Sequence, residues 1–272
     1  MLSDIGGLLM KILNFCLNCL LPELLFNREF RRKSNSGLRF FQKIKSISKA
    51  LLISLISFFF LLSISGVIIG RFIPPAFTPL MIMRVQEKVL SGKRPIIRKH
   101  WEPIGKISSN LALAVIASED NRFFEHFGID LEAIKDAEQQ NRHSRRSRGA
   151  STISQQTAKN VFLFPNHSYI RKGFEVYFTL LIEASWSKKR IMEVYLNVIE
   201  MGDGIYGAEA ASQYYFHKSA AKLNRQEAAL IAAVLPNPRR WRPDKPSAYI
   251  LHRQSWILWN MNNIEPISNF GF

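Results

Sequence analysis

ASEDNRFFEHFGID, from Ala117 to Asp130, and RGASTISQQTAKNVFL, from Arg148 to Leu163, are the stretches of sequence that decide the fold. The first places two acids, Glu119 and Asp120, directly after the apolar, helix-like run 111–117. Acids, amides and lysines are rarely buried without partners, so packing alone does not explain such a density of polar residues among apolar ones. These stretches are therefore the first candidates for a functional site.

The second stretch contains a helix start. Thr152 with Gln155 three residues later has the capping-box pattern, in which each residue hydrogen-bonds the backbone N–H of the other. The helix that follows gathers several polar side chains within about two turns. With Ser151 and Thr152 before them, these are Gln155, Gln156, Lys159 and Asn160.

Composition allows a sizeable core and indicates an anionic partner. The chain has 272 residues, 47% of them hydrophobic, and a formal net charge of +16. Such a charge favours binding to nucleic acid, anionic lipid or a phosphate-bearing substrate. The two cysteines, Cys16 and Cys19, lie close together near the N-terminus, so the rest of the chain has no disulfide framework.

An uncharged run of 21 residues, 50–70, predicts a transmembrane helix, because about 20 apolar residues cross a bilayer. A cleaved signal peptide is disfavoured, since the run is too long and no A-x-A site follows it. Eight basic residues and a single acid precede the run in 28–49, which predicts a cytoplasmic N-terminus and an extracytoplasmic remainder after Arg71.

The rest of the sequence predicts a mainly α-helical protein without a convincing strand. The predicted parts are a basic cytoplasmic region 1–49, the transmembrane helix 50–70, a membrane-proximal connector 71–107 and a catalytic domain 108–272. Helices are expected at 81–90, 111–119, 130–140, 152–160, 169–183, 188–201, 207–215, 225–235 and 247–261.

Local signals support several of these helices. Asn224 with Glu227 three residues later marks the start of the helix 225–235, and Ser187 is expected to cap the helix 188–201. Tyr195 is expected to point inward from that helix. In the helix 130–140 one face is expected to be apolar and to carry Leu131, Ile134 and Ala137.

Two glutamates, Glu119 and Glu175, lie in or beside apolar helices. A carboxyl group in such surroundings can work as an acid or base near neutral pH, and paired carboxylates are typical of glycosyl chemistry. The spacing alone leaves open that both are ordinary surface or ion-paired glutamates.

The motifs resemble those of the bacterial peptidoglycan glycosyltransferases of family 51, in particular the monofunctional transglycosylases. Besides the two opening stretches, the resemblance rests on RKGFE (171–175), SKKRIMEVYLNVIEMG (187–202), GIYGAEAA (204–211) and EAALIAAVLPNP (227–238). It extends from Arg71 to the C-terminus. It implies a lysozyme-like helical domain with a small membrane-proximal jaw.

The resemblance also implies a reaction, the polymerisation of lipid II onto a growing glycan chain. Glu119 would deprotonate the attacking sugar hydroxyl, and Glu175 would be the second acid of the site. The anomeric carbon inverts, and undecaprenyl pyrophosphate leaves. Lys159, Arg171 and Lys172 would stabilise the departing pyrophosphate, because cations are most effective where negative charge accumulates.

The remaining polar residues are expected to line or support the cleft. Ser151, Thr152, Gln155, Gln156 and Asn160 would contact sugar and phosphate groups. Glu193 and Asn197, four residues apart on one helix face, would form a buried polar network that supports the cleft. No second histidine accompanies His126 at ligand spacing, so a structural role is favoured over metal binding. A family requirement for Mg²⁺ or Mn²⁺ stays open. At position 167, where the family often has a basic residue, the chain has His167.

Two competing functions fit parts of the pattern. A lytic muramidase would also use paired acids in a lysozyme-like fold. A non-enzymatic, membrane-tethered basic module would bind anionic lipid or nucleic acid, although the predicted outward topology and the lack of aromatics among the basic runs argue against nucleic acid. The expected partners of the enzyme are lipid II, the glycan chain, the bacterial inner membrane and cell-wall synthesis proteins.

Overall fold

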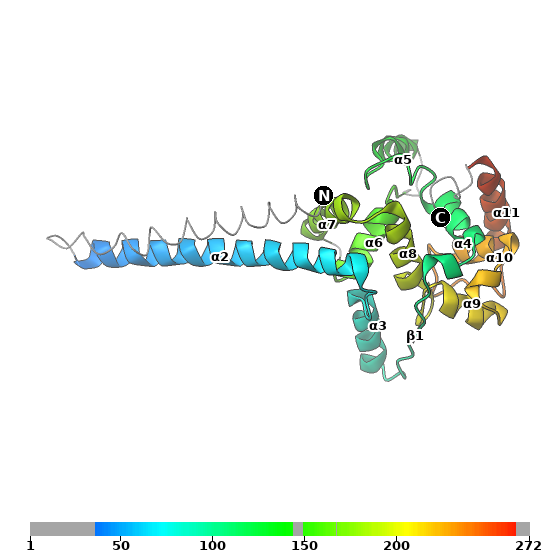
Figure 1. The fold of residues 1–272 in the computed structure, drawn as a ribbon, viewed down its shortest axis with the longest axis horizontal. Coiled ribbons are helices and arrows are strands. Elements are labelled where there is room, and N and C mark those ends of the chain that lie inside the picture. The colour runs from blue at the N-terminus through cyan, green and yellow to red at the C-terminus, as the bar shows by residue number, and fades with distance from the viewer. Residues whose placement is uncertain (1–35, 144–148, 167, 265–272) are drawn as a thin grey trace. The chain divides into compact units, whose positions relative to one another are not determined.

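The computed structural model describes residues 36–143, 149–166 and 168–264. Within these residues the protein is mainly α-helical, as predicted (Figure 1). The α-helices are α2 (Ser36–Phe72), α3 (Pro79–Leu90), α4 (Ser109–Glu119), α5 (Leu131–His143), α6 (Ile153–Phe162), α7 (Tyr169–Ser185), α8 (Lys188–Val198), α9 (Ala208–Phe216), α10 (Arg225–Val234) and α11 (Ala248–Asn263). Two short 3₁₀ helices, η2 (Ile104–Lys106) and η3 (Ala220–Lys222), join them.

The chain divides into two compact units, 1–66 and 67–272. The described part of the first unit is the helix α2 up to Gly66, whose side chains are mostly exposed. The segment Gln42–Phe72 has a mean hydropathy of 2.6 and is long and apolar enough to cross a membrane. The helix is longer than the uncharged run, because the basic flank from Ser36 onward is helical too. It ends two residues before Pro74.

The last turn of α2 belongs to the second unit and is fixed to it by α7 and α8. The indole N–H of Trp186 donates to the Val67 carbonyl at 2.8 Å, and the Arg190 guanidinium donates to the Gly70 carbonyl at 2.9 Å. A Cβ atom at Gly70 would lie 2.9 Å from the Trp186 ring. The absence of a side chain at residue 70 therefore permits this close contact.

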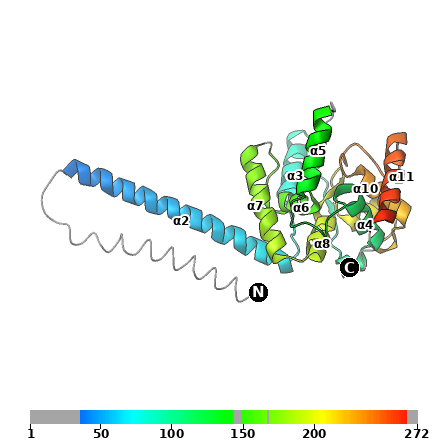
Figure 2. The ribbon, with the colours of Figure 1, turned by 90° about the horizontal axis from the view of Figure 1, so that it is seen from above.

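Two groups of packed helices build the core of the second unit. In one, α4, α10 and α11 pack on one another, and in the other α6 packs on both α7 and α8. Six of the seven residues of α4 from Leu111 to Ala117 are buried, so little of this helix faces solvent. Figures 1 and 2 show α4 between α5 and α11 in both views.

Helix starts follow the sequence signals closely. Both capping boxes, Thr152 with Gln155 and Asn224 with Glu227, are present as predicted. Ser187 accepts from the Arg190 backbone N–H and caps α8, also as predicted. Such caps satisfy N–H groups that have no partner inside the helix.

The prediction of no strand was wrong. A three-stranded sheet with the order β1-β3-β2 joins β1 (Arg98–Lys99), β2 (Glu200–Gly202) and β3 (Ile205–Tyr206). β1 runs parallel to β3, and β2 runs antiparallel to it. Strands of two or three residues are too short to produce an alternating pattern, so the sequence carries no signal for them.

Helix α5 also differs from expectation. It begins and ends slightly later than predicted, and Leu131 and Ile134, expected to share a face with Ala137, are exposed. Of the three residues only Ala137 is buried. The apolar stripe of α5 therefore does not face the core.

Helix α3, which lies in the predicted membrane-proximal connector, is joined to the β2–β3 hairpin by ion pairs. Arg84 Nε lies 3.4 Å from Glu200, and Lys88 lies 2.9 Å from Asp203. Burial raises the pKa of Glu200, and the Arg84 charge partly opposes that effect.

Gly207 provides a test of the packing between the sheet and α8. Its φ is +86°, and an added Cβ would lie 2.7 Å from the Asn197 carbonyl oxygen. We expect Gly207→Ala to destabilise the fold by about 1–3 kcal/mol, because the residue would combine backbone strain with a clash against fixed backbone. Thermal unfolding followed by circular dichroism in detergent measures the change.

Gly173→Ala is the matched control. Gly173 lies inside α7 with open space around its Cα, so alanine there should leave the melting temperature unchanged or raise it. Equal melting temperatures for the Gly207→Ala and wild-type proteins would contradict the assignment of strain to residue 207.

Candidate active site

Glu119 is the last residue of α4 and borders a cavity of about 390 Å³. Its carboxylate accepts hydrogen bonds from Gln156 Nε2 at 2.9 Å and from Ser118 Oγ at 3.1 Å. Arg253 of α11 lies 3.9 Å away. The carboxylate is thus held in one orientation by two helices, with 15% of its side chain still exposed.

The amide that holds Glu119 is itself oriented by a buried phenol. Tyr195 OH donates to Gln156 Oε1 at 3.3 Å, which leaves the amide N–H of Gln156 to face Glu119. Burial raises the pKa of Tyr195 well above its ordinary value, and the nearby acids Glu119 and Asp120 raise it further. The phenol therefore stays protonated and remains a donor.

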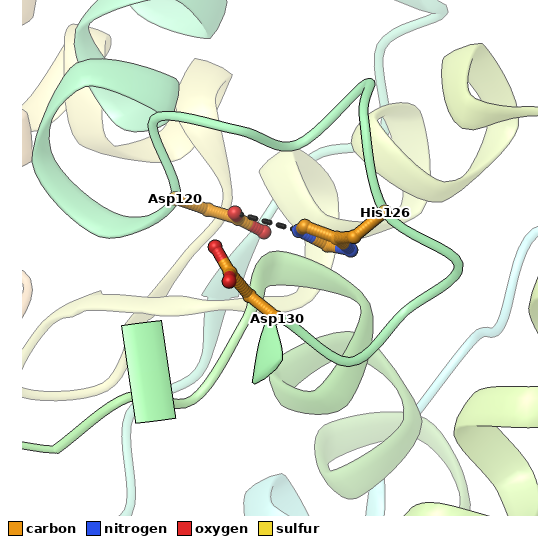
Figure 3. A group of neighbouring side chains, drawn as sticks. All are labelled: Asp120, His126 and Asp130. Carbon is orange, nitrogen blue, oxygen red and sulfur yellow. Dashed lines mark hydrogen bonds and ion pairs between the residues drawn. The ribbon is translucent and has the colours of Figure 1, made fainter. Parts of the chain in front are cut away.

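The loop after Glu119 is fixed by three side chains, which Figure 3 shows together. Asp120 Oδ1 lies 2.8 Å from His126 Nε2, and its Oδ2 accepts from the backbone N–H of Ile153 at 2.9 Å. Asp130 accepts from the Arg122 guanidinium at 2.6 and 3.0 Å. The loop is thereby joined both to itself and to the start of α6.

Asp120, His126 and Asp130 lie close enough together to form a candidate metal site. One ligand atom from each of Asp120, His126 and Asp130 lies within 4.8 Å of the others. However, Arg122 occupies both oxygens of Asp130, and the Ala133 N–H donates to one of them. A divalent ion there would have to displace the guanidinium, so these residues do not fit a metal, and a requirement for Mg²⁺ or Mn²⁺ stays a prediction.

Burial alone would raise the pKa of Asp130. The hydrogen bonds from the Ala133 backbone and from Arg122 outweigh burial and leave the pKa below its ordinary value. The carboxylate is therefore ionised at neutral pH and serves as the permanent partner of Arg122. The structural role predicted for His126 agrees with its position in this hydrogen-bonded loop.

Gly128 lets the loop pass close to α7. Its φ is +78°, and a Cβ there would lie 2.6 Å from the Thr179 side chain. Its carbonyl accepts from the Thr152 hydroxyl at 2.6 Å. Nearby, Lys188 Nζ lies 2.7 Å from the buried Glu183 and donates to the His126 carbonyl at 2.8 Å. The loop therefore lies between the starts of α6 and α8.

The second predicted acid, Glu175, is buried in α7 and paired with two cations. Arg171 Nη1 lies 2.9 Å from Oε2, and Lys172 Nζ contacts Oε1. These residues are one helical turn apart, so the helix itself brings them together. RKGFE thus forms a local cation–carboxylate cluster.

The charges of both acids, Glu119 and Glu175, act on Lys159 of α6. Burial lowers its pKa, the charge of Glu175 opposes that effect most strongly, and Glu119 also opposes it. Within the described residues Lys159 has no carboxylate within 4 Å. Its charge is therefore desolvated without a direct partner, which is the state expected of a cation that binds an anionic ligand.

The other predicted residues fall into two classes. Ser151 and Thr152 border the cavity beside Glu119. Thr152 and Gln155 use their polar groups to cap α6, so they shape the site rather than offer free donors. Asn160 is buried, and its Nδ2 has no hydrogen-bond partner in the described parts of the chain. His167 lies outside the described residues.

Glu193 and Asn197, predicted to form a polar network that supports the cleft, hydrogen-bond the segment before α4. Asn197 Oδ1 accepts from the Glu102 N–H, and its Nδ2 donates to the Glu102 carbonyl, both at 2.8 Å. Glu193 accepts from the Ile104 N–H at 2.9 Å.

Sequence reasoning missed three residues of the site: Tyr195, Arg253 and Trp256. Tyr195 was expected to point inward, but its link to Gln156 was not expected. Arg253 and Trp256 lie on α11, far from Glu119 in the sequence, and Trp256 borders the same cavity. No local pattern connects these residues, because only the packing of α11 on α4 brings them to Glu119.

Residues 88–262 match the family described as transglycosylase, which covers every residue of this site. The chain belongs to the transglycosylase family. Among its relatives, a protein of Bacteroides thetaiotaomicron is 57% identical over 77% of this chain and 84% of its own length. A protein of Bdellovibrio bacteriovorus is 52% identical over 82% and 86%, and one of Aeromonas hydrophila is 47% identical over 83% and 93%. All three are named biosynthetic peptidoglycan transglycosylase.

The desolvated charge of Lys159 should cost stability. Its folded-state pKa lies below the unfolded value, so at neutral pH the protein folds with a charge that burial disfavours. We expect Lys159→Met to raise the melting temperature while it lowers transglycosylase activity. Thermal unfolding and an activity assay on the same preparation measure both effects.

Lys222→Met, on an exposed residue, is the control and should change neither property. A Lys159→Met protein that melts at a lower temperature than wild type would show that the ammonium group is stabilised in the folded protein, contrary to this interpretation.

Proposed function

We propose that this protein is a peptidoglycan glycosyltransferase that polymerises lipid II into glycan strands. The observation that carries the proposal is the arrangement along α6. Gln156 donates a hydrogen bond to the Glu119 carboxylate. The pKa of Lys159, one turn further along α6, is raised by the charges of both Glu119 and Glu175 against the opposing effect of burial. One helix thus places a carboxylate and a desolvated cation in one site, and the names of the relatives agree with such an activity.

Glu119 is the candidate general base. It accepts the proton from the 4-hydroxyl of the acceptor N-acetylglucosamine, and the oxygen attacks the anomeric carbon of the growing chain. The bond from that carbon to the pyrophosphate breaks, so the configuration inverts and undecaprenyl pyrophosphate leaves. A base needs a fixed position and access to substrate, and Glu119 has both, since two donors hold it at the edge of a cavity.

Lys159, Arg171 and Lys172 are the candidates for binding the pyrophosphate. Negative charge grows on the leaving group in the transition state, so cations fixed in advance lower the barrier. Lys159 is the strongest candidate, because its ammonium group has no carboxylate partner within 4 Å in the described chain. Glu175 contacts both other cations and would hold them in place.

A lytic muramidase is the competing activity. It requires a second carboxyl group that is available as acid or nucleophile. Both oxygens of Glu175 contact cations, which suits a residue that organises a phosphate site better than one that reacts with a sugar. Product analysis separates the two activities: a longer polymer from lipid II, or fragments from existing glycan.

The membrane helix completes the proposal. α2 contains a segment able to span a membrane, and the basic residues before it favour a cytoplasmic N-terminus. The catalytic unit would then lie on the outer side of the bacterial inner membrane, where lipid-linked substrate is polymerised. Cell-wall synthesis proteins are the expected partners.

Glu119→Gln tests the base. The amide keeps the size of the side chain but cannot accept the proton, so polymerisation of lipid II should fall about a hundred- to ten-thousand-fold. Binding of lipid II should persist, because the cations are untouched. Polymer formation on gels and binding to the detergent-solubilised full chain give the two readouts.

Glu125→Gln is the matched control, since Glu125 is an exposed glutamate of the same loop. It should polymerise at the wild-type rate. Near-wild-type activity of Glu119→Gln would exclude Glu119 as the base, and Glu175 would become the next residue to test.

The orientation has a separate test. A reporter that is active only outside the cytoplasm, fused after Phe272, should be active in cells, because one span separates it from the N-terminus. Activity of a cytoplasm-only reporter at the same position would contradict the proposed topology.

A further inference from the structure

A cavity that the proposed reaction does not use lies between α3, β1 and the segment 238–242 after α10. Its volume is about 350 Å³, which is in the range of small-molecule sites. Lys88 of α3, Arg98 of β1 and Arg239 of the segment after α10 all border it. None of these three residues borders the cavity beside Glu119, so this cavity is separate from the candidate active site.

Basic residues predominate in the lining of this cavity. Asp203 is the one acid among the lining residues, and the basic ones are Lys88, Arg98, Arg239 and Arg242. Lys88 lies 2.9 Å from Asp203, and Arg242 is paired with Asp244. The undescribed residues 144–148, 167 and 265–272 are all distant in the sequence from the lining residues. Pairing with acids therefore leaves two cations, Arg98 and Arg239, available to an anion.

Arg98 and Arg239 have no close carboxylate partner in the described chain. The Arg98 guanidinium lies over the Tyr214 ring, 5.3 Å from its centroid, and no described carboxylate is within 4 Å of it. Arg239 lies 3.6 Å from Glu87 and 3.9 Å from Asp203, and each of these acids has a closer basic partner. A guanidinium carries a fork of N–H donors that matches the oxygens of a phosphate group. The cavity thus has two such forks at its wall.

β1 is joined to the segment that follows the candidate membrane helix. Lys99, next to Arg98, donates from Nζ to the Ala76 carbonyl at 2.7 Å. Ala76 lies four residues beyond Phe72, the last residue of α2, and four residues span at most about 14 Å. Figure 1 shows α3 beginning close to the last turn of α2. The surface of a bilayer crossed by α2 would therefore lie close to Arg98.

Exposed apolar side chains accompany the cations of this cavity. Val89 and Leu90, directly after Lys88, are 58% and 87% exposed, and Ile96, which borders the cavity, is 50% exposed. Apolar and basic side chains together are typical of segments that lie in a membrane interface. An anionic phospholipid fits both kinds, because its phosphate pairs with cations while its acyl chains contact apolar groups.

We propose that this cavity binds the phosphate of an anionic phospholipid headgroup, held by Arg98 and Arg239. This lipid is not a substrate, and its site is distinct from the cations proposed to bind the pyrophosphate. Because Arg98 and Arg239 lie on different segments, one headgroup would fix both β1 and the segment after α10 to the membrane surface. The bound lipid would thereby set the orientation of the catalytic unit on the bilayer.

The experiment titrates the full chain in a non-ionic detergent with dihexanoyl phosphatidylglycerol, a short-chain anionic phospholipid. Native mass spectrometry over a series of lipid concentrations measures the affinity. Arg98→Gln and Arg239→Gln should each weaken binding about tenfold, the effect of one lost charge-assisted hydrogen bond. Dihexanoyl phosphatidylcholine should bind more weakly than phosphatidylglycerol, because its choline group offsets the phosphate charge.

Arg240→Gln is the matched control. Arg240 follows Arg239 directly, is exposed and does not border the cavity, so its replacement removes the same charge without removing a contact. It should bind phosphatidylglycerol with wild-type affinity. In detergent free of phospholipid all three variants should polymerise lipid II at the wild-type rate, since none of these residues belongs to the candidate active site. If one of the cavity variants fails to fold, the other still tests the site, because Arg98 and Arg239 come from different segments.

Four outcomes would overturn this inference. The first is a wild-type chain that does not bind phosphatidylglycerol, or binds it as well as Arg98→Gln and Arg239→Gln do. The second is an equal loss of affinity in Arg239→Gln and Arg240→Gln, which would indicate a diffuse effect of charge. Inorganic phosphate that binds as tightly as the lipid, with the same dependence on Arg98, would indicate a site for free phosphate. A hexaglutamate peptide that binds more tightly than the lipid would indicate an acidic protein segment as the occupant.

Discussion

The hydrogen bond from the Ile153 backbone N–H to Asp120 Oδ2 is the contact on which the site depends. It joins the loop after α4 to the start of α6, and the Thr152 hydroxyl adds a second link to the Gly128 carbonyl. Once α6 is fixed there, its next turns set the positions of Gln156 and Lys159. Both sides of the candidate chemistry are thus positioned by the start of a single ten-residue helix.

The polar residues at this junction are costly to bury, and the structure offsets that cost with local partners. Asp120 accepts a hydrogen bond from a backbone N–H and contacts His126, while Asp130 accepts a hydrogen bond from the Arg122 guanidinium. Lys159 is different, because burial lowers its pKa and no carboxylate lies within 4 Å of it in the described residues. A buried charge without a carboxylate partner lowers stability, which is why Lys159 is proposed to pair with the pyrophosphate of a substrate.

The sequence predicted contacts between residues three or four positions apart and missed the features that arise from tertiary packing. The capping boxes at Thr152 and Asn224 and the cluster of Arg171, Lys172 and Glu175 follow from spacings of three or four residues, which helix geometry converts directly into contacts. The short strands carry no periodic signal, and the exposed stripe of α5 shows that an apolar pattern does not decide by itself what a helix packs against.

The acids and cations of the candidate site were named from the sequence and their roles stay predictions, whereas the geometry that joins them was not predicted. Nothing in the local sequence around Arg253 or Trp256 indicates that α11 reaches Glu119, since that contact arises only from the packing of α4, α10 and α11. The capping roles of Thr152 and Gln155 were predicted from the sequence and are confirmed, while their contact with substrate stays a prediction. Residues that shape a helix start beside a site and residues that touch substrate have the same composition, so sequence alone does not separate them.

The proposed reaction needs a base for a sugar hydroxyl and cations for a leaving pyrophosphate, and α6 connects the candidates for both. Gln156 of α6 donates to the Glu119 carboxylate, while Lys159, one turn further along, is under the influence of the Glu175 charge. Glu175 in turn contacts Arg171 and Lys172. In the proposed reaction the spacing of one helical turn along α6 would therefore set the separation between the base and the pyrophosphate before any substrate binds.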